Sequence, residues 1–281
     1  MSTVITIRGL RMNYGAVEVL RGVDLNVERG EIFTLLGPNG AGKTTTIEIL
    51  EGFRRRSSGE VSVLGIDPER STEAWRSKLG VVLQAWRDHN RWGTRQLLAH
   101  MSEFFDNPHD PDELLDAIGL TAQAGQRVGR LSGGQRRRLD VALGIIGRPE
   151  LLFLDEPTTG FDPEARQEFH RLITKLATAE GMTVLLTTHD LAEAEKLAHR
   201  TAILVDGQVA VCGTPSELAE AVNTQSHVLW LEDGREQVLT TPDPSQVAWE
   251  LHQRFDGPVP GLTIRRPSLE ESYLNLIGRA S

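Results

Sequence analysis

The sequence contains no run of about 20 apolar residues, which is the length that a helix needs to span a membrane. Its longest apolar stretches, such as Leu151–Leu154 and Ala202–Val205, have the length of a strand. The N-terminus also lacks a charged start followed by an apolar core, so the sequence indicates no export signal. We therefore expect a cytoplasmic protein that cannot cross a membrane by itself.

The sequence also has only one cysteine, and its basic residues do not outnumber its acidic ones. Cys212 is the single cysteine, which excludes an internal disulfide framework and suits a reducing compartment. The chain has 30 Lys and Arg against 39 Asp and Glu, a formal net charge of -9. Domains that coat nucleic acid usually carry a basic surplus, so we expect no nucleic-acid partner. The 8 histidines are scattered without ligand spacing, so the sequence predicts no His/Cys metal site.

Apolar runs of strand length alternate with helical patterns along most of the 281 residues. This alternation is typical of an α/β fold with a mostly parallel sheet and crossover connections. We predict strands at Val4–Ile7, Val17–Leu20, Ile32–Leu36, Val81–Leu83, Leu151–Leu154, Val184–Leu186 and Ala202–Val205. We predict helices at Thr44–Glu51, Arg95–Phe105, Pro111–Ile118, Gly134–Ile146, Pro163–Ala179 and Leu191–Ala198. The helices between about 86 and 147 form a helical insertion.

Residues 220–281 differ in pattern from residues 1–219, and we predict a separate small α+β domain there. Its predicted elements are the strands His227–Leu231, Gln237–Leu239 and Leu262–Ile264 and the helices Ser245–Phe255 and Ser268–Ile277. Asp233 and Gly234 supply a hairpin turn between the first two strands. The domain contains no cluster of catalytic groups, so we expect it to support a dimer or to regulate.

The segment GPNGAGKT fits the phosphate-loop pattern GxxxxGKT in full, and it lies between a predicted strand and a predicted helix. Backbone N–H groups of such a loop surround phosphate oxygens, and the helix N-terminus adds positive charge. Lys43 is expected to bridge the β- and γ-phosphates of ATP, and Thr44 to bind Mg²⁺. The predicted nucleotide contacts are Gly37, Pro38, Asn39, Gly40, Ala41, Gly42, Lys43, Thr44 and Thr45. The alternative is a glycine-rich turn before a helix.

A pair of acidic residues follows the predicted buried strand in the segment LLFLDEP. Asp155 is expected to hold Mg²⁺, directly or through water. Glu156 is expected to act as the general base that polarises the attacking water. The alternative is a helix N-cap, which is the common role of an acidic pair after a strand.

Between these two elements lies the motif LSGGQ, Leu131–Gln135, which we call the signature. With all three elements in this order, residues 3–219 resemble the nucleotide-binding subunit of ABC transporters. The resemblance implies a P-loop ABC-type fold with a mixed sheet core, an antiparallel β edge and a helical subdomain. It also implies that Ser132, Gly133, Gly134 and Gln135 cap the γ-phosphate of an ATP held by the opposite subunit, as a helix N-terminus can.

Four further positions match the family pattern in order. They are Tyr14 for stacking on adenine, Gln84 for Mg²⁺ and the attacking water, Asp162 for reaching across the dimer, and His189 for the γ-phosphate. The resemblance makes Glu156, His189, Gln84 and Lys43 the catalytic residues, and Thr44, Gln84 and Asp155 the Mg²⁺ ligands. Thr159 and Phe161 depart from the Ser and Leu that the family often has, without affecting a catalytic role.

The resemblance implies a subunit that binds and hydrolyses ATP to power transport. Two copies, or one copy and a second ATPase subunit, are expected to pair head to tail and to bind ATP between the phosphate loop and the signature. A separate transmembrane permease subunit is required, so we expect the chain to lie peripherally on the inner face of the cell membrane. Trp86, Trp92, Phe104 and Phe105 are candidate contacts near Gln84, because aromatic residues are enriched at interfaces. Phe104 and Phe105 are equally compatible with the core.

The C-terminal segment Pro267–Gly278 resembles the tail of the ABC-2 exporter group, which includes drug-resistance ATPases, and this resemblance implies export. An ordinary amphipathic helix is the alternative. Two other functions are possible from the residues. One is a soluble ABC-class ATPase that acts on ribosomes or DNA, which the single domain and the lack of heptads between Lys43 and Ser132 disfavour. The other is a GTPase or small-molecule kinase, which LSGGQ and the absence of an NKxD string disfavour.

Overall fold

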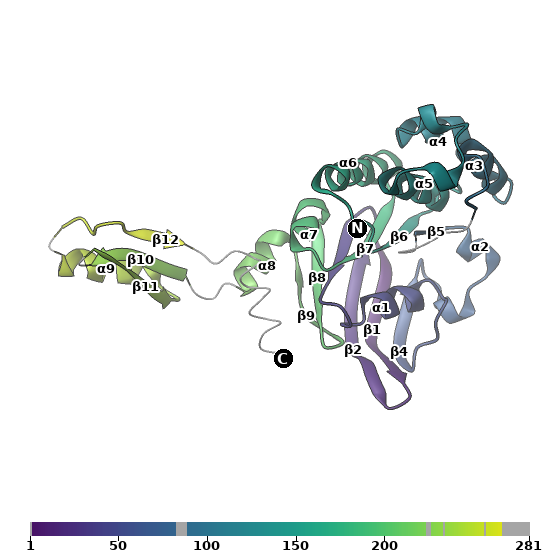
Figure 1. Cartoon of the computed structure of the whole chain (residues 1–281). Coiled ribbons are helices and arrows are strands. Elements are labelled where there is room, and N and C mark those ends of the chain that lie inside the picture. The colour runs from purple at the N-terminus through teal and green to yellow at the C-terminus, as the bar shows by residue number, and fades with distance from the viewer. Residues whose placement is uncertain (1, 83–88, 223–225, 233, 256, 266–281) are drawn as a thin grey trace. The chain divides into compact units, whose positions relative to one another are not determined.

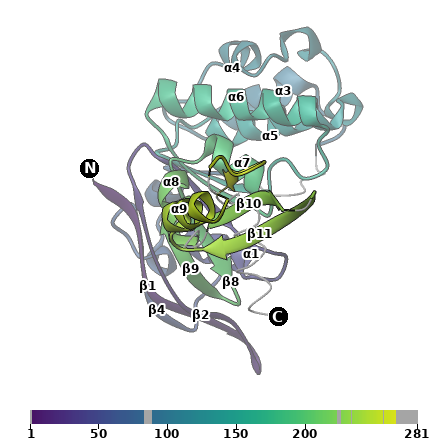
Figure 2. The ribbon, with the colours of Figure 1, turned by 90° about the vertical axis from the view of Figure 1, so that its left-hand side faces the viewer.

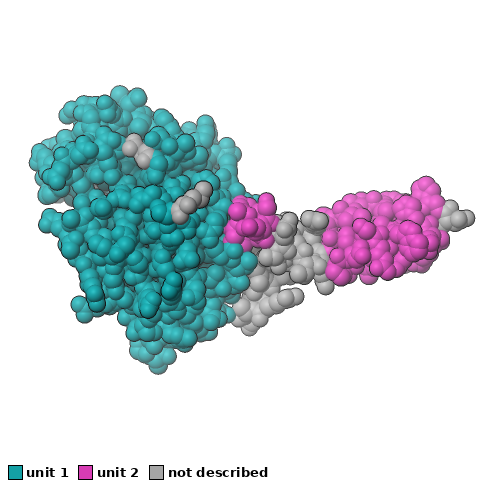
Figure 3. All heavy atoms as spheres, turned by 180° about the vertical axis from the view of Figure 1, so that it is seen from behind, with its two compact units in different colours: residues 1–212 teal, residues 213–281 magenta. Residues whose placement is uncertain are grey.

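The structure of the chain is a computed structural model that describes residues 2–82, 89–222, 226–232, 234–255 and 257–265. It divides into two compact units, Met1–Cys212 and Gly213–Ser281 (Figure 3). This division falls before the predicted 219–220 boundary, because helix α8 (Pro215–Val222) is grouped with the second unit. Within the described ranges, no helix has both the length and the apolar composition that crossing a membrane requires.

Two sheets build the first unit (Figure 1). An antiparallel sheet has the order β2-β1-β4 and contains β1 (Thr3–Tyr14), β2 (Val17–Glu28) and β4 (Ser58–Val63). A six-stranded sheet has the order β5-β6-β7-β3-β8-β9. Its strands are β3 (Ile32–Leu36), β5 (Leu79–Val82), β6 (Leu151–Asp155), β7 (Thr183–Thr188), β8 (Arg200–Val205) and β9 (Gln208–Gly213). The pairs from β5 to β8 are parallel, so the expected mostly parallel sheet is present.

The central strands β3, β6 and β7 are buried throughout and mostly apolar, because both of their faces are covered. Every residue of β6 is buried. Leu151 and Phe153 point into a core shared with the antiparallel sheet, whereas Leu152 and Leu154 point into a core shared with the helices. This alternation follows from the two-residue period of a strand. The sheet therefore holds its carboxyl edge rigidly between two cores, and the acidic residues Asp155 and Glu156 emerge at that edge.

The helices of the first unit are α1 (Lys43–Leu50), α2 (Glu73–Arg76), α3 (Thr94–Ser102), α4 (Pro111–Ala117), α5 (Gly133–Ile145), α6 (Pro163–Glu180) and α7 (Leu191–Leu197). Helices α3, α4 and α5 pack together at one end of the unit (Figures 1 and 2). They form the helical insertion that the sequence predicts. Helix α3 ends earlier than predicted, at Ser102, so Phe104 and Phe105 lie beyond it.

The second unit contains a three-stranded sheet of order β11-β10-β12 and helix α9 (Pro244–Arg254). Its strands are β10 (Ser226–Glu232), β11 (Arg235–Thr241) and β12 (Thr263–Arg265). Val228, Trp230, Leu251 and Val259 form its small core. The strands and helix are those that the sequence predicts, with shifted ends. The predicted helix at 268–277 lies outside the described residues.

Sequence reasoning missed two strands of the first unit, β4 and β9. Strand β4 lacks an apolar run, whereas β9 contains the apolar run Val209–Cys212, which was an available signal. At Gly59 in β4 the backbone has φ 96°, and a Cβ there would lie 2.5 Å from the Gly9 carbonyl oxygen, so only glycine fits. Strand β9 follows β8 through a two-residue turn at Asp206 and Gly207, both with positive φ, which is the geometry of a tight hairpin.

Candidate functional site

The loop between β3 and α1 wraps back over the end of the sheet, and its shape depends on glycine. Gly40 and Gly42 have φ 83° and 104°. A Cβ at Gly37 would lie 2.4 Å from the Leu204 carbonyl oxygen, and one at Gly42 would lie 2.5 Å from Leu20 Cδ2. Side chains are therefore excluded from the places where the loop bends. Its backbone can approach an anion closely, as a phosphate-binding loop requires.

Lys43 is the first residue of α1, and its side chain is only 5% exposed. Its Nζ donates to the carbonyl oxygens of Gly37 and Pro38 at 2.8 and 3.1 Å. The same ammonium lies 3.2 Å from Glu156 Oε1, with which it forms an ion pair. The lysine thus links the phosphate loop to the acidic end of β6, two segments that lie more than a hundred residues apart in the sequence.

Asp155 is the last residue of β6, and its carboxylate accepts hydrogen bonds from two hydroxyl groups. Thr187 Oγ1, at the end of the neighbouring β7, donates to Asp155 Oδ1 at 2.6 Å. Thr44 Oγ1 donates to Asp155 Oδ2 at 3.1 Å. Hydroxyl and carboxylate oxygens are the donors that Mg²⁺ prefers. The two predicted ligands Thr44 and Asp155 are therefore adjacent and chemically suited to Mg²⁺.

Glu156 has a strained backbone, with φ 42° in a region that costs a residue other than glycine about 1–3 kcal/mol. Its carboxylate contacts the side chains of Lys43, Thr159 and His189. Besides Lys43, Thr159 Oγ1 donates to Oε2 at 3.2 Å, and His189 Nδ1 lies 3.4 Å from the same oxygen. Burial alone would raise the pKa of Glu156, but the hydrogen bond and charge of Lys43 outweigh it and lower this pKa. The carboxylate is therefore ionised at neutral pH.

Tyr14 lies at the end of β1 beside the phosphate loop and is partly exposed. Its hydroxyl oxygen is 3.4 Å from Thr45 Oγ1. The guanidinium of Arg54 lies 5.0 Å from the ring centroid, in a cation–π arrangement. Arg54 itself is held by Glu48. One face of the Tyr14 ring is thus covered by Arg54.

Tyr14, the phosphate loop and Glu156 contribute to the lining of one hollow of about 730 Å³. Its lining comprises Tyr14, Val19, Asn39, Gly40, Gly42, Lys43, Thr44, Thr45, Glu156, Thr159 and His189. Sequence reasoning predicted most of these residues from separate motifs, and the fold brings them together. Gln84 and Trp86 lie outside the described residues.

The signature lies in a different hollow, of about 320 Å³. Ser132 caps α5: its hydroxyl accepts from Gln135 N at 3.3 Å, and Gln135 Oε1 accepts from Ser132 N at 2.9 Å. This capping box fixes the start of α5 and orients the helix N-terminus. Gly133 and Gly134 share the hollow with Asp162, whose carboxylate caps α6 by accepting from Ala165 N.

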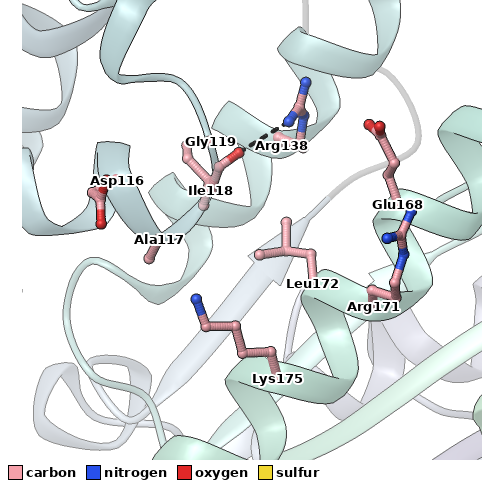
Figure 4. A pocket seen from close by; sticks show the side chains of 9 residues that line it. All are labelled: Asp116, Ala117, Ile118, Gly119, Arg138, Glu168, Arg171, Leu172 and Lys175. Carbon is pink, nitrogen blue, oxygen red and sulfur yellow. Dashed lines mark hydrogen bonds between the residues drawn. The ribbon is translucent and has the colours of Figure 1, made fainter.

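A third hollow, of about 300 Å³, lies between α4, α5 and α6 (Figure 4). Arg138 of α5 donates to the Ile118 carbonyl oxygen at 3.2 Å and so satisfies the C-terminal end of α4. Arg171 and Lys175 of α6 line the same hollow. We therefore assign Arg138 to the packing of the helical insertion.

The candidate docking aromatics fall into two groups. Phe105 is partly buried and packs against the helical core, and a Cβ at Gly147 would lie 2.3 Å from its ring. Phe104 is 68% exposed. Trp92 stacks on His100 with ring centroids 4.9 Å apart, and His100 meets Phe104 edge to face at 5.4 Å. Phe104 therefore ends an aromatic ladder at the surface, in a groove of about 770 Å³.

Sequence reasoning missed two residues at or near the site. Thr187 holds Asp155 and also accepts from the Glu156 N–H at 2.9 Å. Its position before His189 in the string TTHD, at the end of a buried strand, was the available signal. Glu51, at the end of α1, is 5% exposed, and neither of its carboxyl oxygens has a hydrogen-bond partner among the described residues. No pattern in the sequence indicated its burial.

Comparisons with known proteins agree with this geometry. Residues 20–159 match the ABC transporter family. The chain is 36% identical to the daunorubicin resistance ATP-binding protein DrrA3 of Streptomyces coeruleorubidus, over 98% of this chain and 96% of the relative. It is 39% identical to a fluoroquinolones export ATP-binding protein of Mycobacterium tuberculosis, over 76% and 72%. It is 34% identical to the Nod factor export ATP-binding protein I of Rhizobium sp. (strain N33), over 98% and 97%.

Solved structures show the same fold. An ATP-binding subunit of an ABC transporter superposes with a TM-score of 0.69 at 26% identity, over 78% of this chain and 93% of the other. The cbiO1 protein of Clostridium perfringens, part of the ABC transporter complex cbiONQ, superposes with a TM-score of 0.70 at 25% identity, over 79% and 95%. The phosphate loop, acidic strand end and signature thus lie on a fold that solved ATP-binding subunits share.

Proposed function

We propose, from the premise that this chain belongs to the ABC transporter family, that it powers export through a separate membrane subunit. The chain binds ATP and hydrolyses it, as members of this family do. Export is supported by the names of its relatives, which are ATP-binding proteins of daunorubicin resistance, fluoroquinolone export and Nod factor export.

One observation supports a head-to-tail pair of ATPase subunits as the functional unit. The hollow that contains Lys43 and the hollow that contains Ser132 share no lining residue. This separation agrees with the inference that the signature of a second chain covers the γ-phosphate of an ATP on the phosphate loop of the first chain. Head-to-tail pairing of two copies, or of this chain and a second ATPase subunit, supplies both halves of each site.

The residues of the first hollow divide the binding work among them. The loop backbone and Lys43 hold the phosphates, and the ring of Tyr14 holds the adenine. Thr44 and Asp155 would hold Mg²⁺, which supplies positive charge to the phosphates when bound. Thr187 fixes the orientation of the Asp155 carboxylate.

Glu156 is the general base in this proposal, because it is ionised, partly buried and next to the phosphate loop. Its carboxylate accepts a proton from the attacking water as the water oxygen bonds to the γ-phosphorus, and the bond from that phosphorus to the β-phosphate oxygen breaks so that ADP leaves. In the described structure Lys43 occupies Oε1. ATP would draw Lys43 toward the phosphates and free that oxygen for the water. His189, beside Oε2, orients the carboxylate and lies where it can reach the γ-phosphate.

The membrane subunit would dock on the groove that Phe104 enters. Phe104 and Phe105 line this groove together with Lys78 and Glu150. An exposed phenylalanine at the rim of a large groove is the kind of anchor that binds a partner. The chain would then sit peripherally on the inner face of the membrane.

The test is purification of the chain from the membranes of its native cells in mild detergent. An integral membrane protein should co-purify in a stoichiometric amount. Phe104→Ser should reduce its recovery without changing ATP hydrolysis by the isolated chain. Val238→Ser, another exposed apolar residue, is the matched control and should change neither. Purification without any membrane protein would contradict the transport role, and equal recovery with Phe104→Ser would contradict the docking site.

A further inference from the structure

The loop that carries Glu156 is held by a buried arginine that the mechanism above does not use. Arg137 belongs to α5 and is 6% exposed. Its Nη2 donates to the Asp155 carbonyl oxygen at 3.2 Å, and its Nε donates to the Pro157 carbonyl oxygen at 2.9 Å. One guanidinium therefore binds the carbonyls immediately before and immediately after the general base.

A second buried contact holds the next residue of the same loop. Thr158 Oγ1 donates to Glu193 Oε1 at 2.9 Å. His170 Nε2, from α6, lies 3.1 Å from the same oxygen. Thr158, Glu193 and His170 are all buried. Glu193 belongs to α7, the helix that follows His189, so α7 contacts the loop at a point separate from the histidine.

The buried charge of Arg137 requires compensation from its neighbours, and the shape of its guanidinium fixes the directions of its hydrogen bonds. Burial lowers the pKa of Arg137, whereas Asp140, Asp155 and Glu193 act in the opposite direction. A buried cation is tolerated only where hydrogen bonds and opposite charges compensate its lost hydration. The planar guanidinium provides bonds in fixed directions, which a lysine ammonium cannot reproduce. Arg137 therefore fixes the geometry of the loop 155–158 through its directed hydrogen bonds. It does more than supply a positive charge.

The held segment is also the strained one. Glu156 has φ 42°, and strained backbone persists only where surrounding contacts over-determine it. Those contacts are now identified. The Glu156 N–H donates to Thr187, the flanking carbonyls accept from Arg137, and Thr158 is tied to Glu193.

We propose that Arg137 and Glu193 are positioning residues for ATP hydrolysis, which hold the loop 155–158 so that the Glu156 carboxylate faces the attacking water. This inference rests on the proposed role of Glu156 as general base. Neither residue touches the nucleotide hollow, so neither contributes to the affinity for ATP.

Two matched pairs of variants test the proposal. Thr158→Val removes the hydroxyl at constant volume, whereas Thr158→Ser keeps it. Arg137→Lys keeps the charge but loses the two-carbonyl contact, whereas Arg136→Lys makes the same change at a neighbouring residue that pairs with Asp140. We expect Thr158→Val and Arg137→Lys to lower kcat by about tenfold or more, since small displacements of a catalytic group cost up to ~100-fold. Thr158→Ser and Arg136→Lys should retain kcat, and the Kd for a fluorescent ATP analogue should stay within about twofold in all four.

A double-mutant cycle shows whether the effect passes through Glu156. Single-turnover hydrolysis is measured for Glu156→Gln with and without Arg137→Lys. If Arg137 acts by positioning Glu156, adding Arg137→Lys should cause no further loss. An equal loss in both backgrounds, or equal kcat for Thr158→Val and Thr158→Ser, would overturn the inference. Substantial turnover by Glu156→Gln alone would instead refute the general base, while the Thr158 pair would still show whether the loop must be held. Thermal unfolding identifies variants that fail to fold, and the Thr158 pair carries the test if Arg137→Lys is one.

Discussion

Lys43 Nζ lies 3.2 Å from Glu156 Oε1, so the lysine of the phosphate loop forms an ion pair with the glutamate that directly follows β6. The pair is largely buried, and it lowers the pKa of Glu156 against the effect of burial. Under the proposed mechanism, the same lysine also provides positive charge for the phosphates. Binding of ATP and release of the Glu156 carboxylate would then be coupled through one side chain.

Glu156→Gln should retain ATP binding and lose turnover. The amide keeps the shape of the side chain but cannot accept the proton from water, which is expected to lower kcat by roughly 10²- to 10⁴-fold. Phosphate release measures turnover, and gel filtration with ATP should show a trapped dimer. A fall in kcat smaller than about tenfold would mean that another group is the base.

Lys43→Ala should act on binding itself. It removes a charge-assisted contact to the phosphates, typically worth about 1.5–3 kcal/mol, so the Kd for ATP should rise by roughly ten- to a hundredfold. Fluorescence titration with an ATP analogue measures this change. The comparison with Glu156→Gln is informative because the two variants break the same ion pair from opposite ends. An unchanged Kd in Lys43→Ala would contradict the assignment of this loop.

Glu51 makes folding stability depend on pH. Burial, followed by the charges of Asp155 and Glu48, raises its pKa to about 8, above the ordinary value of 4.5. The folded state therefore keeps a proton that the unfolded state releases, and stability is lost as pH rises from about 4.5 to about 8. Glu51→Gln removes this loss, which is on the order of 4 kcal/mol across the interval.

Urea unfolding of wild type and Glu51→Gln at several pH values between 4.5 and 8.5 checks this prediction. The stability advantage of the variant should widen as the pH increases. Glu60→Gln, at an exposed carboxyl on β4, is the matched control and should show little change. A constant difference between wild type and Glu51→Gln over this range would show that Glu51 does not retain its proton.

The second unit should be dispensable for hydrolysis. A chain shortened after Gly213, the end of β9, keeps every described residue of the nucleotide hollow. We expect it to retain ATP hydrolysis and to differ from the full chain in dimerisation or regulation. Circular dichroism establishes folding and light scattering the oligomeric state. Complete loss of hydrolysis by a folded, dimeric truncation would assign the second unit a catalytic role.

The sequence predicted much of the fold because its signals are local. The buried strand β6 is a continuous apolar run, and the phosphate loop, strand and helix follow one another directly. The predictions were weaker where local signals are weak: β1 and β2 extend beyond the short apolar segments that indicated them, and β4 was missed. Strand β4 depends on pairing with the distant β1 and on glycine contacts such as Gly59 against Gly9.

By itself, the sequence determined which chemical groups are available. It contains a phosphate loop, an acidic strand end and a signature, and these features suffice to indicate the family. The tertiary structure decided which of those groups meet. Lys43 reaches Glu156, Thr187 reaches Asp155 and Arg137 bridges the loop around the base, while Ser132 lies in a separate hollow. Such contacts join residues that are distant in sequence, so they arise only when the strands are aligned side by side in the sheet.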